Sequence, residues 1–406
     1  MAKLTKENMM NCRIANDSKY LNHNREYIEE YNDVCPIEKT DIISIKDGIV
    51  LPKSELFISK GGVLDDRHRF VEASSIEDNG SFICINGGYE IDSCDRSQYD
   101  NSVIYLGYFF RHWGHFLMDC TTRMWILLDE RYKDYKIVFP NHPAHVCDGN
   151  YTRFLELIGV TKERIIPVEV PMQFKEVIIP TEARYQPGNS HLDEWYRIFD
   201  RVVDNASYKV DDVPKRVYFS RAHLSKKEFG LEEIEHNYRL NGYDVLYPEE
   251  LSLDEQIGIF RCADEIVSEN SSICMNVVFA KPGLKWTVIN KYSVAHDNFT
   301  ELRYRKNLDI TYVDAFNPKL DIYGQKIGSL PYLISFNRNM KQMFDDRGMR
   351  YETFGKSYRI SNICKYLICC ACHRSQVWMR KTAAKIVRWM KRYTPGFHGF
   401  LKRVLG

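Results

Sequence analysis

Short apolar runs alternate with amphipathic segments between residues 216 and 290, and this pattern predicts strands that alternate with helices. Residues 216–220 have the length and the apolar content of a buried strand. Residues 231–240 follow with helical spacing and end before Asn241-Gly242, a favourable helix stop. The predicted order, β-α-β-α-β-α-β, is typical of a parallel sheet covered by helices. The remaining elements are strands over 244–247, 265–268 and 285–290 and helices over 252–262 and 272–279.

The first half of the chain shows the same alternation less regularly. We predict strands on both sides of a helix over residues 115–131, and further short strands among the first hundred residues. Residues 180–190 are rich in proline, glycine, asparagine and serine, which is typical of a linker. These features predict an α/β protein of more than one domain. The expected units are residues 1–190, 191–350 and 351–406.

Reactive side chains recur at helical spacing within residues 113–123. His115, Asp119 and Arg123 follow one another every four residues, so a continuous helix would carry all three on one face. A histidine, a carboxylate that orients it and a cation are suited to acid–base catalysis. The same spacing also fits a ladder of ion pairs on a solvated helix face. The pattern alone leaves both interpretations open.

Polar residues follow three predicted strands of the second block, at the edge where doubly wound sheets bind ligands. Arg221 has a fork of donors that suits a diphosphate, and Ser271 precedes a helix whose free N–H groups favour a phosphate. The alternatives are a surface ion pair with a nearby Glu for Arg221 and ordinary N-capping by Ser271 and Ser272. An Asp-x-Asp pair commonly holds Mg²⁺ or Mn²⁺ beside a bound phosphate. The chain contains no such pair, so we expect no metal at this site. The candidate ligand-binding residues at this place, predicted to hold a phosphate-bearing ligand, are Ser220, Arg221, Glu249, Glu250, Asn270, Ser271, Ser272 and Asn276.

The composition is that of a folded protein. Of 406 residues, 44% are hydrophobic and 13% are aromatic, which is ample for apolar cores. The first residues contain no apolar signal region, so we expect a cytosolic protein whose twelve cysteines stay reduced. No apolar run reaches the eighteen or so residues that a membrane-spanning helix needs.

The formal net charge of +1 conceals a basic C-terminal segment. Residues 355–406 hold twelve Lys and Arg and no Asp or Glu, so the remainder carries 44 basic and 55 acidic residues. Over residues 378–392, apolar and basic positions fall on opposite faces of a predicted helix. This pattern predicts binding to an anionic membrane surface through residues 359–406, with packing against the acidic body as the alternative. We expect no nucleic-acid partner, because no fold for nucleic-acid binding accompanies the charge.

Four motifs in the chain resemble glycosyltransferase family 61 in their order and spacing. They are residues 115–123, 216–221 and 247–256, and Ile266-Val267 together with residues 276–279. The resemblance extends over roughly residues 100 to 290. Where the family usually has glycine followed by alanine or serine, the chain has Asn270-Ser271-Ser272.

The resemblance implies a GT-B-like arrangement of two Rossmann-type domains, a nucleotide-sugar donor, inversion at the anomeric carbon and no essential metal. It implies that His115 and Asp119 belong to the acceptor-side catalytic motif, and either of them could be the base. The resemblance further implies a glycan or lipid-linked glycan acceptor in capsular or surface polysaccharide synthesis, which we expect at the cytoplasmic face of the membrane. The alternatives are a pyruvyl or phosphate transferase on the same scaffold and a non-catalytic glycan-binding or nucleotide-sugar-binding scaffold.

Overall fold

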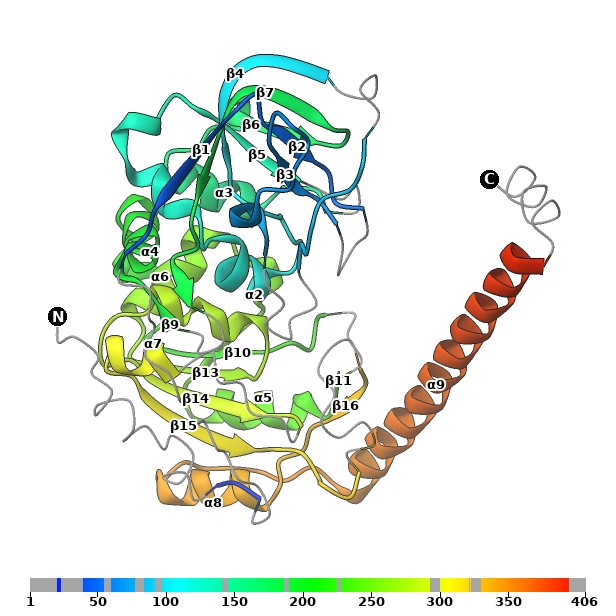
Figure 1. Ribbon diagram of the computed structural model, residues 1–406. Coiled ribbons are helices and arrows are strands. Elements are labelled where there is room, and N and C mark those ends of the chain that lie inside the picture. Colours follow the sequence, from blue (N-terminus) through cyan, green and yellow to red (C-terminus); the bar gives the residue numbers. More distant parts are fainter. Residues whose placement is uncertain are drawn as a thin grey trace.

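The computed structural model shows two sheets toward opposite ends of the body, with helices between them and one long C-terminal helix (Figure 1). The predicted mixture of strands and helices is thus confirmed. The helices between the sheets are α3 (Asn150–Leu157), α4 (Asp193–Asn205) and α6 (Leu253–Cys262). The structure describes residues 20–22, 39–54, 60–76, 84–91, 97–140, 145–185, 190–224, 228–292, 300–320, 322 and 330–393.

The N-terminal sheet is mixed. Its strands are β1 (Ile42–Lys46), β2 (Ile49–Leu51), β3 (Gly62–Leu64), β4 (Ser97–Tyr105), β5 (Lys136–Pro140), β6 (Ile165–Val168) and β7 (Met172–Pro180). The order across the sheet is β3-β2-β7-β4-β5-β6, and β1 also pairs with β7. The pairs β4–β5, β5–β6 and β4–β7 are parallel, whereas β1 and β2 run antiparallel to β7. Parallel pairing is therefore confined to the part of this half where strands alternate with helices.

The second sheet is parallel throughout. Its strands are β10 (Arg216–Phe219), β12 (Asp244–Leu246), β13 (Glu265–Glu269), β14 (Lys285–Asn290) and β15 (Asp309–Asp314). Its helices include α5 (Leu231–Leu240), α6, the 3-10 helix η8 (Ser272–Phe279) and α8 (Arg338–Asp346). The capping box predicted for α6 is present, because Ser252 and Glu255 each bind the other's backbone N–H. The elements predicted between residues 216 and 290 are confirmed, and their bounds shift by no more than one residue.

The strand order of the second sheet creates a crevice beyond the carboxyl ends of two central strands. The order is β12-β10-β13-β14-β15, so the chain first adds β12 on one side of β10 and then returns to add β13 on the other side. The connections that leave β10 and β13 run in opposite directions, and ligands of such sheets bind beyond the carboxyl ends of these two strands. Arg221 follows the end of β10, and Asn270 follows the end of β13.

The continuous helix predicted over residues 115–131 is wrong. A single α-helical turn, α2 (Trp113–His115), leads into the π-helical turn η2 (Phe116–Cys120), and a bend separates these from the 3-10 helix η3 (Met124–Leu128). The Thr121 hydroxyl donates to the Leu117 carbonyl at 2.6 Å, and the Thr122 hydroxyl donates to the Asp119 carbonyl at 3.0 Å. Such side-chain bonds compete with backbone bonds and bend a helix.

One apolar core joins the two sheets. It contains Phe154 of α3, Trp195 and Phe199 of α4, Phe260 of α6 and Phe279 of η8. The predicted domain boundary between residues 190 and 191 falls within β9 (Ser190–His191), which pairs with β8 (Arg184–Tyr185), and the division into domains stays a prediction.

The C-terminal helix α9 (Lys356–Tyr393) begins against the second sheet and then extends away from the body (Figure 1). Near its start it contacts β11 (Glu228–Phe229) and β16 (Tyr332–Leu333), a parallel pair of short strands. The Tyr366 ring lies 6.4 Å from that of Phe229, and its hydroxyl donates to the Leu320 carbonyl at 2.8 Å. Among the described helices, none is both long enough and apolar enough to cross a membrane.

Candidate functional site

The structure brings His115 and Asp119 together. Nδ1 of His115 lies 2.7 Å from Oδ2 of Asp119, across the junction between α2 and η2. The His115 side chain is 32% exposed, whereas that of Asp119 is only 12% exposed. When the bond is donated by Nδ1–H, the second ring nitrogen, Nε2, is the one that can accept a proton. The pair therefore has the form of a base held by a carboxylate rather than that of a solvated ion pair.

Arg184 is the second partner of Asp119, and the sequence interpretation missed it. This buried arginine on β8 donates to Oδ1 of Asp119 and, at 3.2 Å, to the Met118 carbonyl. Burial alone would raise the pKa of Asp119, but the Arg184 charge and the His115 hydrogen bond lower it to about 2. The carboxylate therefore stays ionised. Arg184 is the single basic residue within the segment 180–190 that reads as a linker, and this was the available signal.

Among the contacts given for the described residues, none joins Arg123 to His115, although Arg123 and Asp119 line the same small pocket, so the shared face stays a prediction. The Arg123 guanidinium donates to the carbonyls of Ala73 at 3.1 Å, Ser75 at 2.8 Å and Pro180 at 2.5 Å. The Arg123 side chain is almost fully buried. Arg123 thus ties the segment around Ala73 to the end of β7.

Aromatic rings surround the exposed side of His115. The rings of His112 and Phe110 lie 4.9 and 5.5 Å from the His115 ring, and His145 lies 4.6 Å from Phe110. Nδ1 of His145 is 2.5 Å from the Tyr108 hydroxyl. These rings form an aromatic cluster that includes His115, and the sequence interpretation named none of the others.

A buried charge cluster lies beyond the carboxyl ends of the second sheet. Nε of Arg221 lies 3.0 Å from Oε1 of Glu228, and Nζ of Lys291 lies 2.7 Å from the same oxygen. Arg221 follows β10, Lys291 follows β14, and Glu228 belongs to β11. The carboxylate is 1% exposed and both cations are 6% exposed, so the ion pair with a nearby Glu considered for Arg221 is present, but it is buried and does not lie at the surface. Sequence reasoning found Arg221 but missed the other two residues.

Glu269, the last residue of β13, belongs to the same cluster. The Tyr218 hydroxyl donates to its Oε1, whereas Oε2 has no hydrogen-bond partner among the described residues. Burial, reinforced by the negative charge of Glu228, raises the pKa of Glu269 to about 8. Oδ1 of Asn270 and Oγ of Ser271 are likewise buried and unpaired within the described part of the chain. Ser271 occupies the N-cap position of η8 without making the capping bond, so the N-capping alternative is wrong.

The segment that leads into His115 contacts the start of η8 at Gly114. A Cβ atom on Gly114 would lie 3.3 Å from Cγ of Met275 and 3.7 Å from Cα of Ser272, so glycine allows α2 to approach the start of η8 closely. Next to it, Nε1 of Trp113 donates to Oδ1 of Asn276 at 2.6 Å. His115 therefore comes directly after Trp113 and Gly114, which contact η8, whose first residues are predicted to bind a phosphate.

Residues 113–289 match the model of one protein family, Glycosyltransferase 61. The match begins in α2 and ends in β14, so it includes His115, Asp119, Arg221 and Glu269 but stops short of Lys291. It supports the predicted resemblance to this family and, with it, a glycosyltransferase. The comparison with curated proteins finds no match.

Several predicted donor-binding residues have other partners. The Ser220 hydroxyl donates to Glu235 at 2.6 Å, and Asn276 joins Trp113 to Gln256, so both residues hold elements together. Glu249 and Glu250 are exposed, and Glu250 pairs with His223 at 2.6 Å. Among the contacts given for the described residues, none joins either acid to the buried cluster. Ser272 is partly exposed beside Gly114.

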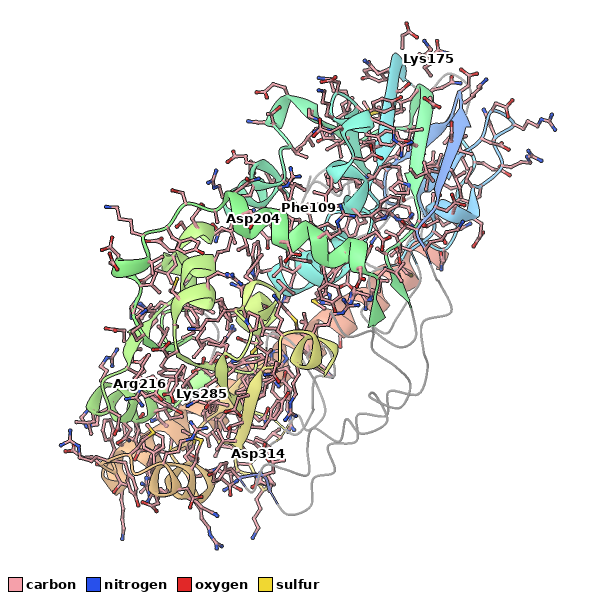
Figure 2. The ribbon with its side chains drawn as sticks, turned by 90° about the vertical axis from the view of Figure 1, so that its left-hand side faces the viewer. Phe109, Lys175, Asp204, Arg216, Lys285 and Asp314 are labelled. Carbon is pink, nitrogen blue, oxygen red and sulfur yellow. The ribbon has the colours of Figure 1, made fainter. Side chains whose placement is uncertain are left out.

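A cavity of about 300 Å³ lies at the amino ends of the strands of the second sheet, opposite the buried charge cluster. Its lining includes Arg216, Glu265, Lys285 and Asp309, which are the first residues of their strands. Figure 2 labels Arg216 and Lys285, which begin their strands, and Asp314, which ends β15. Because ligands of doubly wound sheets bind at the carboxyl ends, this cavity is not the candidate donor site.

No group of three or more metal-binding side chains within the described part of the chain is arranged to hold an ion. The cysteines described on α9, namely Cys364, Cys369, Cys370 and Cys372, are free thiols.

Proposed function

We propose that the protein is an inverting glycosyltransferase that moves a sugar from a nucleotide-sugar donor to a hydroxyl of a glycan or lipid-linked glycan. The contact between Gly114 and the start of η8 carries this proposal, because Gly114 directly precedes His115 and η8 follows β13, whose neighbouring strands lead into the buried cations. Transfer needs a base and a stabilised leaving group on either side of the reacting carbon. The family match includes His115, Asp119 and Arg221 but ends before Lys291, and we propose a GT-B-like arrangement of two Rossmann-type domains.

His115 is the proposed base. Arg184 keeps Asp119 ionised, and a carboxylate with a pKa of about 2 is a poor base near neutral pH. Asp119 instead orients the ring through Nδ1 and leaves Nε2 for the acceptor hydroxyl. Nε2 takes the hydroxyl proton while the oxygen attacks the anomeric carbon. The bond from that carbon to the diphosphate oxygen breaks, and the new glycosidic bond has the inverted configuration.

The leaving nucleoside diphosphate takes up the electron pair of the broken bond. Arg221 and Lys291 are two buried cations that share the Glu228 carboxylate. One negative charge therefore balances only part of their combined positive charge. The start of η8 adds backbone N–H groups near them. Preorganised positive charge of this kind stabilises a developing anion without a metal ion, and we propose a metal-independent reaction.

Transfer of sugar from a panel of nucleotide sugars tests the proposal. The purified protein should release nucleoside diphosphate from one donor and should keep doing so in EDTA. Loss of activity in EDTA with rescue by Mn²⁺ would contradict metal independence. Failure of every nucleotide sugar to bind or to be hydrolysed would instead favour the non-catalytic scaffold.

We further propose that α9 binds an anionic membrane surface at the cytoplasmic face, where surface polysaccharide is made. Residues 356–393 include ten Lys and Arg and no acidic residue. Trp378 is 68% exposed and Met379 is 54% exposed, on the part of α9 that extends away from the body (Figure 1). Apolar side chains beside basic ones are typical of helices at anionic lipid surfaces.

Sedimentation with vesicles tests this surface. A chain that ends at Ser375 keeps the contacts of Tyr366 and loses eight of the twelve basic residues counted after residue 354. Each basic residue near an anionic surface contributes about 1 kcal/mol, and salt screens the attraction. The full chain should therefore sediment with phosphatidylserine vesicles at low salt, and the shortened chain should not. Equal behaviour of the two chains would refute the proposal.

A further inference from the structure

We propose that Glu269 acts as a protonated carboxylic acid in the donor site and donates a hydrogen bond to a phosphoryl oxygen, beside Arg221 and Lys291. The inference rests on the proposed function, because it assigns a further residue to the site that receives the donor diphosphate. The proposal adds one uncharged hydrogen-bond donor to the two cations. It also makes binding of the diphosphate depend on a proton that Glu269 holds.

The position of Glu269 in the sheet supports this assignment. Glu269 ends β13, which lies between β10 and β14, and these neighbouring strands lead into Arg221 and Lys291. The carboxyl group is therefore placed at the crevice where the strand order reverses. Its side chain is completely buried, as is almost all of Glu228, which binds both cations.

The hydrogen bonds of Glu269 leave one oxygen unused. Oε1 accepts from the Tyr218 hydroxyl, and Oε2 has no partner among the described residues. The next two residues carry the unpaired atoms Oδ1 of Asn270 and Oγ of Ser271. Because buried polar atoms are nearly always paired, three unpaired atoms on consecutive residues indicate a place that a ligand completes. A protonated Oε2 has a hydrogen to donate to a phosphate, whereas an ionised carboxylate would repel it.

The surrounding charges favour the protonated form. The two cations already share the negative charge of Glu228, and burial together with that charge raises the pKa of Glu269 to about 8. A bound diphosphate adds negative charge and raises the pKa further, so binding above pH 8 takes up a proton. The titratable or charged groups that act on Glu269 from the elements around it are Tyr218, Arg221, Glu228, Tyr238, Cys274 and Lys291.

Calorimetric titration of the full chain with UDP, GDP, ADP and CDP tests the inference between pH 7 and 9.5. For the nucleotide that binds best, affinity should be nearly constant up to pH 8 and should then fall by about tenfold per pH unit, as the loss of one proton requires. Titrations at pH 9 in buffers of different ionisation enthalpy should show uptake of about one proton per nucleotide.

The variant Glu269→Gln is the matched control, because its amide is neutral at every pH and still has N–H donors. It should bind the same nucleotide with an affinity that does not fall between pH 8 and 9.5. A fall that persists in Glu269→Gln would assign the proton to another group, such as Lys291, and would overturn the inference. So would a wild-type protein with constant affinity and no proton uptake at pH 9. If none of the four nucleotides binds the wild-type protein at any pH, the proposed function itself fails.

Discussion

The clusters around Asp119 and Glu269 each bury a carboxyl group, and they affect its ionisation in opposite ways. At Asp119 one carboxylate faces Arg184 and His115, and both of its oxygens are bonded. At Glu269 a second buried carboxyl competes with Glu228 for the same cations, and one of its oxygens has no described partner. The pKa of Asp119 falls to about 2, whereas that of Glu269 rises to about 8.

This difference shows that burial alone does not decide the charge of a carboxyl group. Both side chains lose water, which favours the neutral form, and the bonded partners decide whether that cost is offset. The site around Asp119 is complete and keeps a base oriented. The site around Glu269 is incomplete in its hydrogen bonds, as expected for a place that a ligand fills. Each prediction below alters one side of this comparison.

Gly230→Ala should disrupt the donor side most. Gly230 lies between β11 and α5 with φ +97°, and a Cβ there would lie 2.1 Å from the Ile334 carbonyl oxygen. We expect a loss of about 3 kcal/mol in the free energy of unfolding, measured with urea, because backbone must move. Gly242→Ala is the control, since Gly242 also has a positive φ but nothing within 4 Å of its Cβ position. Its cost should stay near 1 kcal/mol, and equal costs in the two variants would contradict the steric explanation.

His115→Ala should remove the acceptor-side chemistry. We expect turnover to fall by about a hundredfold or more while the thermal unfolding temperature stays close to that of the wild type, because the histidine is partly exposed. His236→Ala is the matched control, since His236 is a similarly half-buried histidine that pairs with Glu352, away from Asp119. Near-normal turnover in His115→Ala would rule out His115 as the base.

Glu269→Gln should change how stability depends on pH. In the unfolded chain a glutamate ionises above its ordinary pKa of 4.5, whereas folded Glu269 keeps its proton until about pH 8. The unfolded state then binds fewer protons, so wild-type stability falls as pH rises from 4.5 to 8. The glutamine variant lacks this contribution, and we expect it to gain about 2 kcal/mol on the wild type between pH 5 and pH 6.5. Urea unfolding at both values measures the gain, and parallel curves would show that Glu269 is ionised in the folded protein.

Arg184→Met should shift the pH profile of turnover. Without the Arg184 charge, the pKa of buried Asp119 rises from about 2, and the carboxylate that orients His115 becomes protonated at a higher pH. We expect about a tenfold lower turnover near pH 6 and an acid limb displaced to higher pH, with partial recovery in Arg184→Lys. A uniform loss at every pH would mean that Arg184 acts through packing alone.

Local patterns predicted much of the second sheet and one pair of the site. The helix over Leu231–Leu240 and the strand over Lys285–Asn290 have the predicted bounds, because apolar spacing and turn residues encode such elements locally. The contact of His115 with Asp119 is also local, four residues apart, and it survives the change from α- to π-helical geometry. The helix beyond Asp119 was predicted wrongly because hydroxyl bonds from Thr121 and Thr122 bend it.

The sequence by itself determined the alternation of strands and helices, the spacing of His115 and Asp119, and the basic charge of the last fifty residues. Only the tertiary structure decided which charges meet. Asp119 and Arg184 are 65 residues apart, and Glu228 and Lys291 are 63 residues apart. No local pattern pairs such residues, because they meet where separate strands end at one edge of a sheet or where a hairpin folds back. Their charge states follow from that meeting, since burial and the number of partners set each pKa.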